Sequence, residues 1–401
     1  MSSAEPRVRD FPNTPPGQLR PAALLDELRE REPVSRVRLP YGRDGWLVTR
    51  HDDVRTVLTD HRFSRAAGVC EDVPRSTPRV PRADSILSMD PPEHSRLRGL
   101  LVKAFTGRRV EQLKPRTEAI ARDLLDTIAD GGGPADLVEK FCLPLPVTVI
   151  CELLGVPAER RGSFREWSEA FVSSTRLTGQ EIEAAHGHLR DYLGELIAER
   201  RAVPSNDLLG ALVTARDGEG RLSEGELVTF GVTLLVAGHE TTAGQLGNFL
   251  YLLLTHPDEL RLLRERPGLL PSAIEEMLRY VPIAASAGFA RIAKEDVVLS
   301  GVTIRAGEAV LASEPAGNRD ASVFADADSL RFDRKTNPHL AFGHGVHHCL
   351  GAPLARMELQ VAIKAVFDRF PRLRLAVDPR EVRWKSGSLA HGVAELPVIW
   401  E

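Results

Sequence analysis

The chain of 401 residues lacks most features that mark special classes of protein. It has few cysteines, and their scattered spacing does not fit a disulfide framework; they are Cys70, Cys142, Cys151 and Cys349. No uninterrupted stretch approaches the ~20 apolar residues needed to span a bilayer, and Met1 to Asp10 contains no apolar signal core. We therefore expect a soluble, cytoplasmic protein that neither spans nor binds a membrane.

Charge and glycine patterns argue against two further classes. The formal net charge of -4 is small for this length, which argues against nucleic acid as a main partner. The chain has no glycine fingerprint of a dinucleotide-binding fold and no flavin-type segment, so we do not expect it to take electrons from NAD(P)H itself. Its 42% of hydrophobic residues are spread evenly without a linker, which favours one domain over residues 1–401.

Hydrophobic periodicity predicts a mainly α fold with minor β structure. The stretch 63–89 is rich in proline, arginine and small residues and predicts a long irregular loop. Strand-like runs occupy 34–39, 45–49, 288–299 and 302–312. Helical patterns occupy 21–32, 93–106, 109–130, 141–154, 158–174, 179–202, 223–254, 272–280 and 350–370.

The most informative motif surrounds a lone cysteine. Residues 342–351 read F-G-H-G-V-H-H-C-L-G and run directly into a predicted helix. The N-terminus of that helix would supply positive potential to a Cys349 thiolate, while Gly345 and Gly351 would let the backbone approach a flat ligand. We favour a single heme iron here. Two alternatives stay open: a zinc site, which would lack its second ligand pair, and a buried structural thiol.

A second motif interrupts an apolar helical pattern. Residues 234–243 read L-L-V-A-G-H-E-T-T-A. Thr241 lies four residues after Ala237, so its hydroxyl can donate a hydrogen bond to the Ala237 carbonyl oxygen. Such a bond weakens the backbone hydrogen bonding of the helix and predicts a bulge or kink with room for water. Glu240 and Thr241 would then handle protons in an apolar pocket. The alternative is an ordinary capping or solvent-facing Glu-Thr-Thr sequence.

Together these motifs resemble those of the cytochrome P450 superfamily. Residues 342–351 fit the superfamily pattern F-x-x-G-x-x-x-C-x-G. The continuation A-P-L-A-R at 352–356 is similar to the soluble bacterial branch of the superfamily. The sequence A-G-x-E-T-T at 237–242 is similar to the oxygen-activation motif of the superfamily. The resemblance covers nearly the whole chain and implies a helical bundle around heme b, with a small β-sheet region. It also implies that Cys349 is the axial thiolate, that Ala237, Phe342, Gly343 and Gly351 adjoin the heme, and that Glu240 and Thr241 deliver protons.

The resemblance gives roles to residues that carry little signal alone. Glu276 and Arg279 are three apart on a predicted helix and would ordinarily form a weak surface pair. In the family the corresponding pair is buried beneath the heme, with Arg334 as a third member. Four cationic side chains would hold the heme propionates, namely His94, Arg98, Arg291 and His347.

The expected activity is oxygen insertion into a bulky, mostly apolar secondary metabolite. We expect the pocket walls at 63–89, 175–179, 235–237, 283–289 and 389–391, where the small residues of 284–288 would leave space. The chain looks most like actinobacterial members that tailor macrolides and polyketides by hydroxylation or epoxidation. Electrons would come from a ferredoxin and its NAD(P)H-dependent reductase, docked on a basic patch of the expected monomer formed by Arg96, Lys103, Arg108, Arg109 and Arg356. Acids of the long loop, Glu71, Asp72 and Asp84, are candidates for binding an amino sugar. The alternatives are a heme protein without turnover and a peroxide-driven oxygenase.

Overall fold

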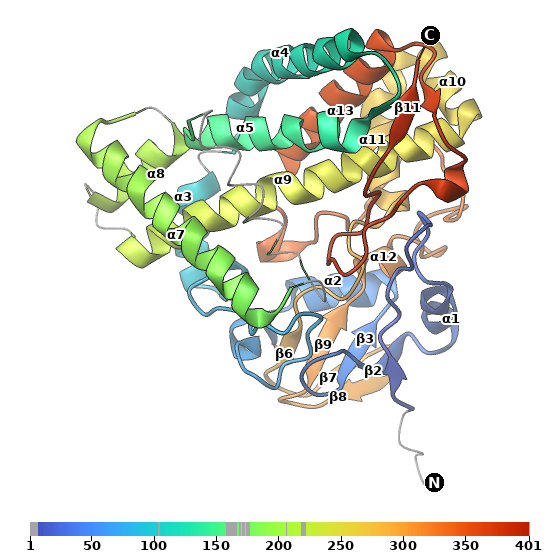
Figure 1. Cartoon of the computed structure of the whole chain (residues 1–401). Helices are drawn as coiled ribbons and strands as arrows, with labels where there is room; N and C mark the ends of the chain where they lie inside the picture. Colours follow the sequence, from blue (N-terminus) through green and yellow to red (C-terminus); the bar gives the residue numbers. More distant parts are fainter. Residues whose placement is uncertain are drawn as a thin grey trace.

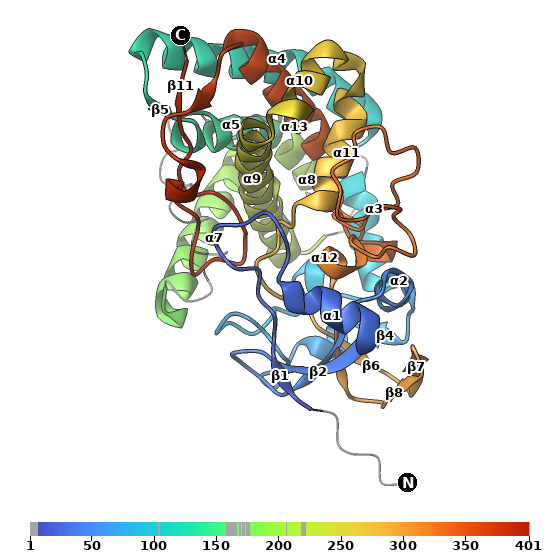
Figure 2. The same ribbon diagram turned by 90° about the vertical axis from the view of Figure 1, so that its right-hand side faces the viewer.

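The computed structural model describes residues 7–102, 105–157, 167, 170, 173, 177–205, 207–217 and 222–400. Helix α9 crosses the middle of the molecule, with α4, α5 and α13 on one side of it and α7 and α8 near its N-terminal end (Figure 1). Strands β1, β2, β4 and β6 to β8 lie with α1 and α2 at the bottom of Figure 2, whereas β5 and β11 lie at the top beside α4 and α5. The mainly α architecture with a minor β region is therefore confirmed.

Apolar faces pack the helices into one extensive core. Helix α5 lies on α9, and α13 lies on α4. Helix α9 begins at a capping box in which Ser223 and Glu226 satisfy each other's backbone N–H groups, and its apolar residues surround most of its circumference, so it is buried. The longer helices are α1 (Ala23–Arg31), α2 (His51–Thr59), α3 (Glu93–Val102), α4 (Gly107–Gly131), α5 (Pro144–Leu154), α7 (Gly179–Ala202), α8 (Leu208–Asp217), α9 (Glu224–Thr255), α10 (Pro257–Glu265), α11 (Leu270–Tyr280) and α13 (Ala352–Arg369).

A six-stranded sheet joins distant parts of the chain in the order β1-β2-β3-β9-β6-β4. Strands β3 and β9 are parallel, with Trp46 opposite Val310, while β6 and β9 are antiparallel, with Arg291 also opposite Val310. A three-stranded sheet β10-β11-β5 and the hairpin β7-β8 complete the strands. Their bounds are β1 (Arg9–Asp10), β2 (Val34–Arg38), β3 (Gly45–Val48), β4 (Phe63–Ser64), β5 (Ala135–Asp136), β6 (Arg291–Ala293), β7 (Val297–Leu299), β8 (Val302–Ile304), β9 (Ala309–Ala312), β10 (Arg374–Leu375) and β11 (Pro397–Ile399).

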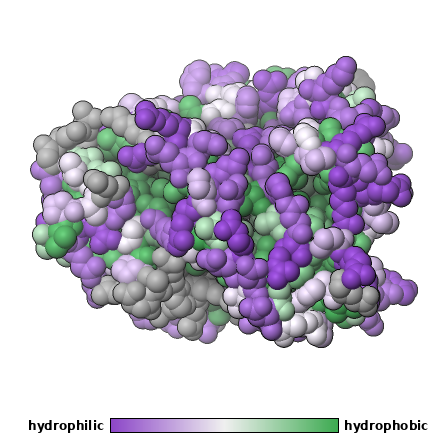
Figure 3. Space-filling view, turned by 90° about the horizontal axis from the view of Figure 1, so that it is seen from above, coloured by the Kyte–Doolittle hydropathy of each residue, from purple (hydrophilic) through white to green (hydrophobic). Residues whose placement is uncertain are grey.

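Short helical elements connect the longer helices and strands. The four-residue helix α12 (Glu314–Gly317) follows β9, and single turns η1 (Ala66–Gly68) and η2 (Ile86–Ser88) lie within the otherwise irregular stretch 63–89. The helix expected at 158–174 falls largely outside the described residues. Hydrophilic side chains are spread over the face seen in Figure 3, with apolar ones between them. Within the described ranges, no helix is long and apolar enough to cross a membrane.

Candidate active site

Cys349 lies in the loop that leads into α13. Its backbone N–H donates a hydrogen bond to the carbonyl oxygen of Phe342 at 2.8 Å, which closes the turn. Gly345 has a φ of +71°, and a Cβ atom there would lie 2.7 Å from the carbonyl oxygen of Leu58, so only glycine allows this approach. The guanidinium of Arg356 stacks over the Phe342 ring, 4.5 Å from its centroid. Gly345 therefore lets the loop lie close to the backbone of Leu58, and the expected approach of Gly345 and Gly351 to a flat ligand stays a prediction.

The Cys349 thiol is accessible to solvent although it lies within the molecule. Burial raises the pKa of the thiol, while the backbone N–H groups of Gly351 and Ala352 and the charges of Arg98 and Arg356 act to lower it. A side chain that is exposed yet surrounded by protein groups lies at the wall of a recess. The buried-thiol alternative is therefore wrong, and across the described ranges no group of three or more His, Cys, Asp or Glu side chains is placed to hold a metal such as zinc.

Helix α9 presents two accessible residues, Ala237 and Thr241, from its otherwise buried middle. Residues four apart lie on one face of a helix, so both border the same open space. The Thr241 hydroxyl donates to the Ala237 carbonyl at 3.1 Å, which confirms the expected hydrogen bond. Helix α9 continues through this point without a break, and the expected kink with room for water stays a prediction. The carbonyl oxygen has two lone pairs and can accept both the hydroxyl and the helical N–H.

Glu240 is directed into the protein and is only 2% exposed. Its Oε2 lies 3.5 Å from Nζ of Lys385, its Oε1 lies 3.7 Å from Nε2 of His239, and Oε1 accepts no hydrogen bond from the described residues. The capping or solvent-facing alternative is therefore wrong for Glu240. Lys385 comes from the C-terminal segment, and no motif in the sequence marked it. Because its side chain is 21% exposed, it connects the buried carboxylate with the surface.

Three of the four predicted propionate ligands converge. The rings of His94 and His347 lie 4.2 Å apart, and Arg291 is near enough to act on both electrostatically. Burial, with nearby arginines, lowers the pKa of His94 to about 4 and that of His347 to about 2, so both are neutral at pH 7. The fourth residue, Arg98, donates to the carbonyl oxygen of His348 at 2.6 Å and lies beside the cysteine.

This cluster leaves several buried nitrogens without a protein acceptor. No described residue accepts a hydrogen bond from His94 Nδ1, His347 Nε2 or Arg291 Nη2. Nε of Arg65 likewise has no hydrogen-bond acceptor among the described residues. Sequence reasoning missed Arg65 because no motif marks it. Buried polar groups are normally paired, so these nitrogens fit a ligand that brings its own anionic acceptors. Beside an accessible thiol, a heme with two carboxylates fits this donor set.

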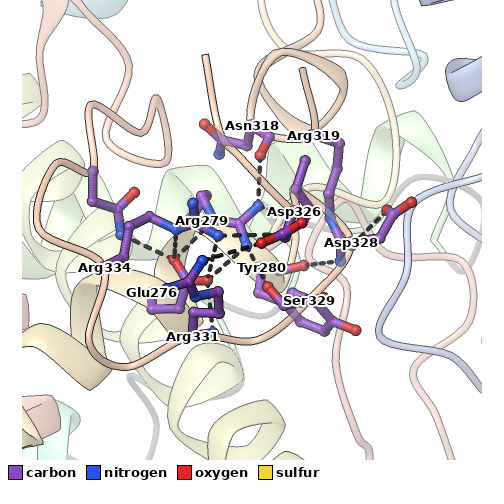
Figure 4. A network of polar contacts seen from close by, with 12 residues as sticks. Glu276, Arg279, Tyr280, Asn318, Arg319, Asp326, Asp328, Ser329, Arg331 and Arg334 are labelled. Atoms are coloured by element: carbon purple, nitrogen blue, oxygen red, sulfur yellow. Dashed lines mark hydrogen bonds and ion pairs between the residues drawn. The ribbon is translucent and has the colours of Figure 1, made fainter. Parts of the chain in front are cut away.

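The predicted Glu276–Arg279 pair forms the centre of a buried network (Figure 4). Both side chains are 0% exposed, and Arg279 Nη2 lies 2.7 Å from Glu276 Oε1. Arg334 joins as expected, with its Nε 3.0 Å from Glu276 Oε2. Arg279 also donates to three carbonyl oxygens and so joins α11 to the loop before the cysteine; they belong to Asn318, Ala327 and Ser329. The single carboxylate of Glu276 is therefore shared by two guanidinium groups, and backbone carbonyl oxygens accept the remaining hydrogen bonds of Arg279.

Segments from three parts of the chain form one side of the expected substrate pocket. The backbone N–H of Thr14 donates to Ala285, and that of Ala285 donates to Leu389. The hydroxyls of Ser76, in the long loop, and Ser286 are 2.6 Å apart. Ile283 packs near Gly244 of α9, since a Cβ atom on Gly244 would lie 3.1 Å from it. The predicted walls at 63–89, 283–289 and 389–391 are thus brought together, whereas 175–176 lies outside the described residues.

The structure does not favour the loop acids as anchors for a cation. Arg82 holds the Asp84 carboxylate with two hydrogen bonds, at 2.9 and 2.8 Å, and lowers its pKa despite partial burial. Glu71 and Asp72 are exposed on the outside of the loop, where Asp72 lies 3.8 Å from Arg43. None of the three presents a buried, uncompensated carboxylate.

Known proteins share this arrangement over the full length of the chain. Residues 171–266 and 263–387 match the family described as Cytochrome P450. Mycinamicin IV hydroxylase/epoxidase of Micromonospora griseorubida is 53% identical and covers 100% of both chains, and nocardicin C N-oxygenase of Nocardia uniformis subsp. tsuyamanensis is 55% identical over 93% of this chain and 94% of its own. The crystal structure of the LnmA hydroxylase from the leinamycin pathway of Streptomyces atroolivaceus S-140 superposes with a TM-score of 0.89 at 55% identity, covering 95% of this chain and 97% of that one.

Proposed function

The chain belongs to the cytochrome P450 family, and from this premise we propose that it hydroxylates or epoxidises a bulky secondary metabolite of the macrolide or polyketide class. The enzyme class is that of a monooxygenase, since its relatives are named hydroxylase, epoxidase and N-oxygenase. Those names speak against the alternative of a heme protein without turnover. The proposal is carried by two exposed positions in otherwise buried surroundings, Cys349 before α13 and the Ala237–Thr241 face of α9, which we infer to border one recess.

Heme b is the cofactor that we propose, and the described residues would contact its iron, its ring and its propionates. Cys349 would bind the iron, with the amides of Gly351 and Ala352 directed toward its sulfur, and Phe342, Gly343 and Ala237 would line the ring. The propionates would accept from the unpartnered nitrogens of the site, those of His94, His347, Arg291 and Arg65, with Arg98 nearby. When bound, a heme with a thiolate ligand supplies the activation of O2 for insertion of one oxygen atom.

Proton handling falls to two neighbouring side chains of α9. The Thr241 hydroxyl, held at the recess by the Ala237 carbonyl, would donate a hydrogen bond to oxygen or to its water. The buried Glu240 carboxylate would receive protons from the side of Lys385, whose ammonium reaches toward solvent. The acid and the alcohol therefore lie on the route from surface to recess.

Electrons have to come from a partner protein. We propose that a ferredoxin, reduced by an NAD(P)H-dependent reductase, supplies them, because no nucleotide-binding glycine motif occurs in the chain. We also propose that the protein acts as a cytoplasmic monomer. The candidate docking residues differ in availability. Arg96 and Arg356 are already paired with Glu226 and Glu275, and Lys103 lies outside the described residues. Arg108 and Arg109 are exposed at the start of α4.

The ligand assignment is tested by replacing two lone cysteines separately. We expect Cys349→Ser to lose the reduced carbon monoxide absorption typical of thiolate-bound heme, because serine is a poor donor to ferrous iron. Cys70→Ser is the matched control, since Cys70 is an exposed cysteine of the long loop, and it should keep the wild-type spectrum. A Cys349→Ser protein with an unchanged spectrum would refute the site.

The substrate class is tested by optical titration of the wild-type protein. Macrolides and open polyketides should shift the heme absorption band as they displace bound water, and compact terpenes of similar polarity serve as the comparison. Compounds that shift the band are then incubated with the protein, ferredoxin, reductase and NAD(P)H, and the masses of the products are measured by mass spectrometry. A gain of one oxygen atom supports the proposal, whereas turnover with terpenes alone contradicts the substrate class.

A further inference from the structure

The guanidinium of Arg356, near the start of α13, is directed toward the cysteine loop. It lies over the ring of Phe342, 4.5 Å from the ring centroid. The carbonyl oxygen of Phe342 accepts the hydrogen bond from the backbone N–H of Cys349 at 2.8 Å, so the ring that Arg356 covers belongs to the same turn as the sulfur. The positive charge of Arg356 therefore lies behind the cysteine loop, where it acts electrostatically on His348 and Cys349.

Glu275 of α11, which packs on α13, binds this guanidinium in a bidentate ion pair. Nε and Nη2 of Arg356 lie 2.7 and 2.8 Å from the two carboxylate oxygens of Glu275, in the fork geometry that these two groups favour. The side chains of Arg356 and Glu275 are only 32% and 29% exposed, so water and salt screen the pair incompletely. Removal of either charge would leave the other one uncompensated beside the loop.

His339 adds a hydrogen bond to this ion pair but no charge. Its Nδ1 accepts from the backbone N–H of Ala341 at 3.2 Å, so the ring proton is on Nε2, which donates to Glu275 at 3.0 Å. An imidazole with a single ring proton is neutral. The group formed by Glu275, Arg356 and His339 therefore has no net charge, and the loss of one partner of the ion pair would give it a full charge of one sign.

A charge at this place bears on the iron that Cys349 would bind. Reduction of a ferric heme adds one negative charge, so an uncompensated positive charge nearby favours the ferrous form. The same positive charge lowers electron donation by the sulfur, which acts in the same direction. The other arginine beside the sulfur, Arg98, donates to the carbonyl oxygen of His348. Of these two arginines, Arg356 alone has an acid partner among the described residues.

We propose that Glu275 sets the reduction potential of the heme by offsetting the charge of Arg356 behind the cysteine loop. The inference rests on the heme site proposed above and assigns a role to a carboxylate that acts only through another residue. Glu275 is therefore a positioning residue. The arrangement also explains why Arg356 is a poor docking residue for a partner protein, because its charge is already held by an acid of the same molecule.

The test removes each charge of the ion pair separately and then both together. The midpoint potential of the holoenzyme is measured by optical redox titration with mediators and without ferredoxin, so docking does not enter. Glu275→Gln leaves Arg356 uncompensated and should favour the ferrous form about tenfold, which is a positive shift of about 59 mV for one electron. Arg356→Gln should shift the potential in the negative direction by a similar amount. The double variant should return to within about twofold of the wild-type equilibrium.

Two further variants control for changes of structure. Arg356→Lys keeps the positive charge but loses the bidentate geometry, and it should stay close to the wild-type potential. Asp368→Asn removes the acid from an exposed ion pair with Lys364 on the same helix, α13. It should leave the potential unchanged.

The proposal requires shifts of opposite sign in Glu275→Gln and Arg356→Gln. Shifts of the same sign would mean that the pair only holds the loop in place, and the absence of a shift in either variant would mean that its charge does not reach the iron; both outcomes overturn the proposal. If Glu275→Gln does not bind heme, the two Arg356 variants decide, because a negative shift is required with glutamine and none with lysine. A wild-type protein without the thiolate absorption in its reduced carbon monoxide complex would instead count against the heme site itself.

Discussion

At the scale of single residues, the two adjacent threonines of α9 have different surroundings. Thr241 is accessible at the recess, while Thr242 is buried, with its hydroxyl 3.4 Å from the Gly238 carbonyl. We expect Thr241→Ala to lower the fraction of NAD(P)H electrons that reach product by roughly 10- to 100-fold, because the proton donor at the recess is lost. Peroxide release and product are measured together.

Two controls sharpen this prediction. Thr241→Ser retains the hydroxyl and should recover most of the coupling, and Thr242→Ala removes a hydroxyl that does not face the recess and should leave coupling near the wild-type value. Equal coupling in Thr241→Ala and wild type would contradict the proton-delivery role. The peroxide-driven alternative would be supported if peroxide alone sustained product formation at the same rate.

Sequence reasoning reached the residues that belong to contiguous motifs. Cys349 and Thr241 are named by local patterns, and their surroundings agree with the expectation. Lys385 and Arg65 were missed because each acquires its significance only from residues distant in the sequence. The local sequence around a charged loop residue does not indicate whether its side chain pairs with a buried group or faces solvent.

At the scale of elements, Glu275 ties α11 to α13 and to the loop before the cysteine. Arg356 Nε and Nη2 lie 2.7 and 2.8 Å from its carboxylate oxygens, and His339 Nε2 lies 3.0 Å away. Burial alone would raise the pKa of Glu275, but the hydrogen bonds from His339 and Arg356 lower it to about 2. The contact therefore stabilises the fold fully above about pH 4.5, and this contribution is lost as pH falls toward 2.

We expect Glu275→Gln to lower the free energy of unfolding by roughly 1–2 kcal/mol at pH 7, after allowance for partial exposure of the pair. The difference from wild type should shrink as the pH is lowered from about 4.5 toward 2, because the Glu275 carboxylate of the unfolded chain takes up a proton in this range while that of the folded protein stays ionised. Urea unfolding at a series of pH values measures both quantities. Exposed Glu265→Gln is the control, and a difference that is constant with pH would contradict the assignment.

Long helices were predicted well, because their apolar periodicity repeats over many turns; α4, α7 and α9 begin and end within about two residues of the expected limits. Short elements were missed. Helix α2 (His51–Thr59), α8 (Leu208–Asp217) and α10 (Pro257–Glu265) span only two or three turns each, too few for a clear period. The run 288–299 proved to be two strands, β6 and β7, separated by a turn.

At the scale of the whole molecule, the proposed ferredoxin site depends on charges left free by the fold. Arg108 and Arg109 are exposed at the start of α4, which packs on α13 behind the cysteine loop. Reversal of both to glutamate should slow reduction of the heme by ferredoxin about tenfold at low salt, with less effect at high salt. Stopped-flow reduction under carbon monoxide measures the rate.

The comparison variant for this test is Arg305→Glu, a single charge reversal directly after β8, where the Arg305 side chain is 69% exposed. It should reduce at the wild-type rate. Equal slowing by both changes would mean that overall charge, rather than a docking face at α4, governs the encounter. The single-domain organisation of the chain and its monomeric state stay predictions that this experiment does not address.

The pocket wall at Ala285 has a consequence for synthesis of the protein. It is held on one side by Thr14 and on the other by Leu389, so its backbone pairing uses the beginning, middle and end of the chain. Contacts of such large sequence separation form late in folding. While the segment around Leu389 is still inside the ribosome, Ala285 lacks this backbone partner, so the wall is completed only after that segment has emerged.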